Sequence, residues 1–97
     1  MIGYRLLPPA EEEMTEAALF YEAARSGLGD AFLGDIQHAI ETVRERPHLG
    51  VAVAYGFRRA LVRRFPFSLV YAVEGEEIVV VAVAHQRRSP NYWRGRV

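Results

Sequence analysis

The residues best suited to chemistry lie together near the end of this 97-residue sequence. Seven consecutive apolar residues, 78–84, are followed within ten residues by an imidazole, three guanidinium groups, a phenol and the only indole of the chain. These side chains belong to His85, Arg87, Arg88, Tyr92, Trp93 and Arg94. An unbroken apolar run predicts a strand that is covered on both faces. Polar groups that such a rigid strand carries to the surface are typical of a binding or catalytic site.

The chemistry open to this cluster is anion binding and proton transfer. All twelve basic residues are arginine, whose planar side chain binds a carboxylate or phosphate through two hydrogen bonds. His85 and Tyr92 are the candidates for proton transfer. A structural interpretation is also open, in which His85 is a hydrogen-bonded residue at the strand end and the rings of Tyr92 and Trp93 pin the tail to the domain. The alternative for the two rings is a contact surface beside the arginines.

Metal and covalent chemistry find no support in the sequence. The three histidines, His38, His48 and His85, do not stand at the spacing of metal ligands. Cysteine is absent, glycine is scattered, and no serine lies in a nucleophile motif. We therefore predict no metal and no cofactor. The lack of cysteine also fits a cytoplasmic protein.

The formal net charge of zero conceals an asymmetry between the two halves of the chain. Residues 1–50 hold nine acids and four arginines, a net charge of −5, whereas residues 51–97 hold eight arginines and three acids, a net charge of +5. The second half therefore predicts a cationic surface for a polyanion or an acidic peptide. Four of its arginines fall in one expected strand, whose alternation places Arg58 and Arg64 on one face and Arg59 and Arg63 on the other. Taken singly, each also fits a solubilising residue of an edge strand.

Hydrophobic periodicity predicts one strand, two helices and three further strands, in that order. The expected strands are 2–7, 57–65, 67–73 and 78–84, and the expected helices are 10–26 and 30–46. Pro8 and Pro9 are expected to end the first strand, and Ser26 or Asp30 to cap the second helix. Gly75 predicts a two-residue type II′ turn between the last two strands.

The expected fold is one α+β domain over residues 1–97, with an N-terminal strand and an antiparallel helical hairpin packed on a small, mainly antiparallel β-sheet. Alternation places His85 on the face of Val79, Val81 and Val83. The residues expected to be largely buried are Phe32, Ile36, Ile40, Val43, Leu69, Tyr71, Val81 and Val83. The first residues carry no signal-peptide core, and the longest apolar run is far shorter than the ~20 residues that span a bilayer. We expect a soluble cytoplasmic protein that makes no contact with a membrane.

These segments and their order resemble the RelE/ParE superfamily of toxins from bacterial type II toxin–antitoxin modules, over about residues 4–94. The residues that carry the resemblance are the helix beginning near Glu11, Gly27-Leu28-Gly29-Asp30-Ala31-Phe32, Pro47, Gly50, Gly56-Phe57-Arg58-Arg59, Phe65-Pro66-Phe67 through Val70-Tyr71, and His85 to Trp93. The Phe65-Pro66-Phe67 turn and the ending from His85 to Trp93 look closer to the ParE side.

The resemblance implies a growth-inhibiting toxin of the plasmid-stabilisation type, held inactive by a cognate antitoxin with an acidic C-terminal segment. On the ParE branch the target is DNA gyrase, which is bound without covalent chemistry. On the ribonuclease branch the target is messenger RNA in the ribosomal A site, which is cut by metal-free acid–base cleavage. The binding residues would be Arg58, Arg59, Arg87, Arg88, Trp93 and Arg94, and a ribonuclease would use His85, Arg58, Arg88 and Tyr92.

The sequence departs from the ribonuclease branch at several positions. That branch commonly uses lysines and arginines, but lysine is absent here. Ungapped alignment places Ser68 and Gln86 where the branch tends to have arginines. These departures favour a gyrase-binding inhibitor, with the ribosome-dependent endoribonuclease as the alternative.

Overall fold

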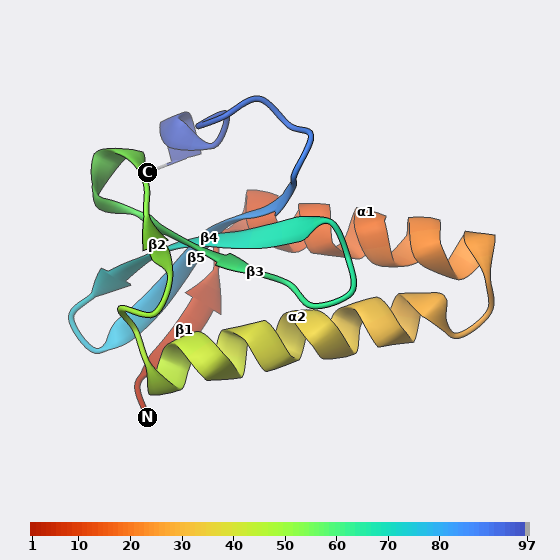
Figure 1. Cartoon of the computed structure of the whole chain (residues 1–97), viewed down its shortest axis with the longest axis horizontal. Coiled ribbons are helices and arrows are strands. Elements are labelled where there is room, and N and C mark those ends of the chain that lie inside the picture. Colours follow the sequence, from red (N-terminus) through yellow and green to blue (C-terminus); the bar gives the residue numbers. More distant parts are fainter. Residues whose placement is uncertain (97) are drawn as a thin grey trace.

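The computed structural model describes residues 1–96 as two helices packed on a five-stranded sheet (Figure 1). In chain order the elements are β1 (Gly3–Leu6), α1 (Pro8–Ala24), α2 (Leu28–Glu45), β2 (Val51–Ala52), the 3₁₀ turn η1 (Ala54–Gly56), β3 (Arg58–Leu61), β4 (Phe67–Glu74), β5 (Glu77–His85) and η2 (Arg94–Arg96). The sheet order is β1-β5-β4-β3-β2. Only β1 runs parallel to its neighbour, β5, and the other pairs are antiparallel. The expected α+β fold with a helical hairpin and a mainly antiparallel sheet is confirmed.

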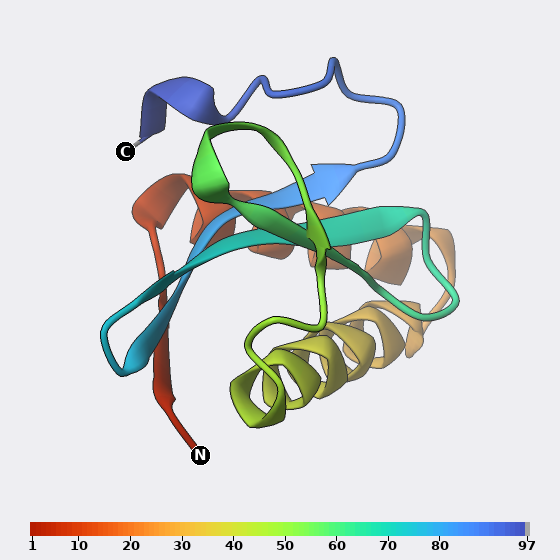
Figure 2. The same ribbon diagram turned by 60° about the vertical axis from the view of Figure 1, so that its left-hand side comes forward.

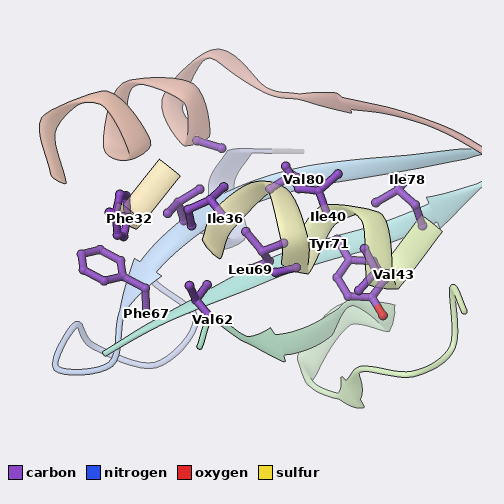
Figure 3. Packing of buried hydrophobic residues seen from close by; sticks show 13 residues of the cluster. Phe32, Ile36, Ile40, Val43, Val62, Phe67, Leu69, Tyr71, Ile78 and Val80 are labelled. Carbon is purple, nitrogen blue, oxygen red and sulfur yellow. The ribbon is translucent and has the colours of Figure 1, made fainter. Parts of the chain in front are cut away.

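The sheet is covered on both faces, by the helical hairpin on one side and by the C-terminal tail on the other (Figure 2). On the helix side, the apolar stripe of α2 meets alternate residues of β4 and β5 (Figure 3). All eight residues expected in the core are buried there or on the tail side. On the tail side, a second cluster joins Val79, Val81 and Phe57 to Trp93. Burial on two faces explains the unbroken apolar run of β5.

Both helices begin earlier than expected, for reasons of backbone chemistry. Pro8 and Pro9 lie in the first turn of α1. The first N–H groups of a helix have no partner inside the helix, so proline, which has no N–H group, loses no hydrogen bond there. The expected side-chain cap of α2 is absent: Gly27 is the N-cap, with φ of 87°. The carboxylate of Glu22 instead accepts hydrogen bonds from the amides of Gly27 and Gly29, each at 2.9 Å. No helix within residues 1–96 is both long and apolar enough to cross a membrane.

The strand expected at 57–65 is half that length, and β3 ends at Leu61. The chain turns there because the Val62 amide donates to the carbonyl of Phe67 at 2.9 Å. Arg64 adopts a left-handed φ of 66° and donates to both oxygens of the buried Asp35 carboxylate, at 2.8 and 2.9 Å. The expected alternation of arginines therefore holds for Arg58 and Arg59 but is wrong for Arg63 and Arg64.

A β-bulge in β5 reverses the face on which the strand ends. Val70 pairs with Ala82, but the next residue, Tyr71, pairs with Val80, so Val81 is the extra residue. Val81 therefore packs on the tail side, whereas Val83 packs on the helix side. The expectation that His85 shares a face with Val79 and Val81 is wrong, and its ring lies 5.1 Å from that of Phe67 in the helix-side core.

Candidate functional site

The C-terminal tail, residues 86–96, folds back over the sheet and is anchored by Trp93. The indole is only 4% exposed and packs edge-to-face against Phe57, with ring centroids 4.9 Å apart, and against Tyr55 at 6.5 Å. The tail thus lies beside the loop of η1 in both ribbon views (Figures 1 and 2). The burial of the indole fits the interpretation in which this ring pins the tail to the domain.

A hollow of about 480 Å³, which we call the tail hollow, lies between the anchored tail and residues of β3 and β4. Five of the site residues expected from the sequence line it: Arg59, His85, Arg88, Tyr92 and Trp93. Ser68 and Gln86 also line it. An open, partly polar depression with two guanidinium groups is suited to binding an anionic group.

One wall of this site is held by a buried carboxylate that the sequence did not point to, Glu13 of α1. Its oxygens accept hydrogen bonds from the Tyr92 hydroxyl at 2.7 Å and the Val83 amide at 3.0 Å. Both terminal nitrogens of Arg96 donate to the same carboxylate, at 2.8 and 2.9 Å, and one also donates to the Val81 carbonyl at 3.0 Å. β1 ends before it reaches Val81 and Val83 of β5. Glu13 and Arg96 take its place as hydrogen-bond partners of the Val83 amide and the Val81 carbonyl, and their ion pair ties the tail to α1.

This network sets the protonation of its members. Burial alone would raise the pKa of Glu13, but hydrogen bonds from Arg96, Tyr92 and the Val83 amide outweigh it, and the pKa is lowered. Burial, followed by the hydrogen bond to Glu13, raises the pKa of Tyr92 well above its ordinary value of 10.0. The guanidinium carbon of Arg88 lies 3.9 Å from the centre of the Tyr92 ring. At neutral pH Tyr92 is therefore a fixed hydrogen-bond donor with an arginine stacked on it.

His85 has a local structural partner. Its Nδ1 accepts a hydrogen bond from the amide of Arg87 at 3.0 Å, which fixes the ring at the point where β5 ends. This matches the interpretation of His85 as a hydrogen-bonded residue at the strand end.

The remaining predicted binding residues lie in different surroundings. Arg58 is turned inward and donates to the carbonyls of Gly50 and His48, at 2.8 and 3.3 Å, so it braces the loop before β2. Arg87 and Arg94 are exposed on the tail, and Arg59 is exposed on β3. The structure brings Arg88 of the tail together with Arg59 at the tail hollow, which Arg58 does not line.

Sequence reasoning missed Glu13 because it stands in a run of glutamates at the start of a helix, where solvated acids are common. A signal was available in the spacing. Glu13 follows the buried Ala10 by three positions and precedes the half-buried Ala17 by four, so it lies at the border of the apolar stripe. Arg96 carried no distinguishing signal, since nothing in the sequence tells which tail arginine turns inward.

Comparison with known proteins agrees with this fold. The family model described as the ParE toxin of the parDE type II toxin–antitoxin system matches residues 4–90. No curated protein sequence matches the chain. A solved structure from the chromosomal ParDE toxin–antitoxin system of P. aeruginosa shares the fold, with a TM-score of 0.65 and 19% identity over 88% of this chain and 96% of that one. The chain belongs to the ParE family of toxins of type II toxin–antitoxin systems.

Proposed function

We propose that this toxin acts by binding DNA gyrase and that a cognate antitoxin with an acidic C-terminal segment neutralises it. The observation that carries the choice of target is the hydrogen bond from Tyr92 to Glu13 at 2.7 Å. It occupies the hydroxyl of Tyr92, one of the two groups, with His85, that the competing ribonuclease mechanism would use for proton transfer.

Metal-free RNA cleavage requires a base for the 2′-hydroxyl, an acid for the leaving group and cations for the developing charge. Because its pKa is raised, Tyr92 stays protonated at neutral pH and is not available as the base, and its one proton is donated to Glu13. Ser68 and Gln86 further occupy positions where the ribonuclease branch tends to carry arginines. Each missing cation is expected to cost about 10²-fold in rate, as for a single oxyanion donor.

The exposed arginines of the tail supply a surface for non-covalent inhibition. Arg87, Arg88 and Arg94 are exposed on a segment that Trp93 and Arg96 hold against the sheet. A rigid cationic surface loses little conformational freedom on binding, which favours affinity. In this proposal Trp93 contributes by anchoring the tail from beneath, and the gyrase contacts come from the arginines above it.

The endoribonuclease is the second candidate, because the tail hollow brings Arg59 and Arg88 together, with His85 at its border. The two guanidinium groups are suited to clamping a phosphate, but the His85 ring lies against Phe67 on the helix side and would have to turn toward the hollow to move a proton. The two candidates differ in whether Tyr92 is needed for its hydroxyl.

The experiment compares supercoiling by purified gyrase with messenger RNA cleavage on programmed ribosomes, using one antitoxin-free preparation. We expect loss of supercoiling and no cleavage. Charge reversal at Arg94 should weaken inhibition about tenfold or more, whereas the same change at Arg25, an exposed arginine at the end of α1, should leave it unchanged. Normal supercoiling together with A-site cleavage that disappears in Tyr92→Phe would overturn the proposal and establish the ribonuclease.

A further inference from the structure

The sheet has an open edge beside β3. The edge strand β2 covers only Arg58 and Arg59, which pair with Ala52 and Val51. On the β2 side, the Phe57 carbonyl accepts a hydrogen bond from the Val53 amide. On the opposite side, the Val62 amide donates a hydrogen bond to the Phe67 carbonyl of β4. Backbone groups alternate in direction along a strand, so those of Leu61 point outward, past the end of β2. Within residues 1–96 they have no strand beside them. An unpaired edge of this kind is a template for another strand.

Exposed apolar side chains gather at the same place. Leu61 is 68% exposed, Val51 66% and Leu49 51%. Beside them lies a second hollow of about 350 Å³, the helix hollow, whose lining includes Ala39 and Val43 of α2 and Ala60 of β3. Single exposed apolar residues are ordinary, but three of them around a groove and a free strand edge mark an interaction surface.

Arg59 and Leu61 border both hollows, the helix hollow on one side of the sheet and the tail hollow on the other. A strand added along β3 would send alternate side chains to the two faces of the sheet. One set would enter the mainly apolar helix hollow. The other set would enter the tail hollow, where it would meet Arg59 and Arg88.

We propose that the open edge of β3 is where the acidic segment of the antitoxin docks, as an added strand with alternating apolar and acidic side chains. The charge at the edge selects this occupant: Arg59 and Arg63 are both exposed there, and Arg88 lies across the tail hollow. Apolar side chains would fill the helix hollow while carboxylates pair with arginines. Main-chain hydrogen bonds would supply affinity, and the two hollows would set the register.

This proposal rests on neutralisation by an antitoxin, so its test must distinguish failure of docking at the β3 edge from failure of neutralisation itself. The probe is the purified cognate antitoxin, added to isotope-labelled toxin. We expect the Leu61 amide to exchange rapidly in the free toxin and to become protected in the complex. The amide of Arg59, which by the same alternation is bonded to β2, serves as the internal control because it is protected in both states.

Variants give an independent measurement of the same edge. Leu61→Asp should weaken antitoxin binding about tenfold or more, the scale that burial of one leucine side chain supports, and Arg63→Glu should weaken it in a salt-dependent manner. The matched control is Leu19→Asp on α1, because Leu19 is 66% exposed and lies on another surface. Denaturant unfolding checks that each variant is folded, and the exchange measurement on the unaltered toxin does not depend on any of them.

The outcomes are distinct. Antitoxin binding without protection at Leu61, or with equal effects of Leu61→Asp and Leu19→Asp, overturns the docking proposal and leaves neutralisation standing. Weaker binding in Leu61→Asp without protection of the amide identifies a helix in the groove and likewise overturns the added strand. Failure of the antitoxin to bind the unaltered toxin removes the proposed neutralisation itself.

Discussion

Replacing Glu13 with alanine should loosen the C-terminal tail and destabilise the whole domain. The carboxylate accepts hydrogen bonds from Arg96, Tyr92 and the Val83 amide. Among its bonds within residues 1–96, Arg96 would keep the one to the Val81 carbonyl. We therefore expect the loss to come from donors left without partners as well as from the broken ion pair.

The magnitude follows from the burial of the pair. Removing one partner from a fully buried ion pair costs about 3–5 kcal/mol. The side chains of Glu13 and Arg96 retain 15% and 19% of their exposure, so water offsets part of this loss, and we expect about 2–4 kcal/mol for Glu13→Ala. Glu13→Gln keeps acceptor capacity but loses the charge, which should cost about 1–2 kcal/mol. Either loss is a large fraction of the 5–15 kcal/mol typical of a domain.

The assay is urea unfolding, with hydrogen exchange at the Arg94 and Arg96 amides as the local readout. Both amides are bonded within the tail, so their exchange should quicken more than that of β4. Glu12→Ala, an exposed neighbour on the same helix turn, is the control and should change stability by about 0.5 kcal/mol or less. A loss below about 1 kcal/mol for Glu13→Ala, or unchanged exchange in the tail, would refute the reasoning.

Three further outcomes are expected. The lowered pKa of Glu13 favours its charged form in the folded state. The charged carboxylate therefore stabilises the fold above the ordinary carboxyl pKa of 4.5, and this contribution is lost as the pH falls through the folded-state pKa. Acid titration should narrow the difference in unfolding free energy between the unaltered protein and Glu13→Gln. Tyr71→Phe should cost about 1–3 kcal/mol in urea unfolding, because the Gly50 amide and the Pro47 carbonyl lose the buried hydroxyl that bonds both. Arg64→Ala should lower the melting temperature more than Arg64→Gly, since only glycine relieves the left-handed φ of 66° when the bond to Asp35 is lost; the reverse order would contradict the account of this turn.

The fold was predictable where one physical effect dominates a segment. The apolar run of β5 and the stripe of α2 are long enough that burial decides both the element and the face that is covered. Boundaries were less predictable, because they depend on partners elsewhere in the chain. β3 ends at Leu61 through a turn that Asp35 of α2 braces, and no property of residues 57–65 alone reports that contact.

The candidate site was predictable in composition and only partly in geometry. The tail supplied the correct residue types, but a single extra residue at Val81 turned His85 to the other face. Bulges arise where two strands must both stay paired and change curvature, which depends on the sheet as a whole. Likewise, the burial of Trp93 depends on Phe57, which lies 36 positions earlier in the chain.

The split in charge has a different meaning in the folded protein from the one that the sequence suggested. Arg64 and Arg96, from the positive half, are paired with Asp35 and Glu13 of the negative half, so part of the asymmetry is used to join the two halves. Arg58 is also occupied, by backbone carbonyls. The charge available to a partner is therefore concentrated on the outer arginines of the tail and of the β3 edge. Two cationic surfaces thus lie on either side of the tail hollow, and an acidic segment seated on the β3 edge would lie within reach of the arginines that we assign to the gyrase contact.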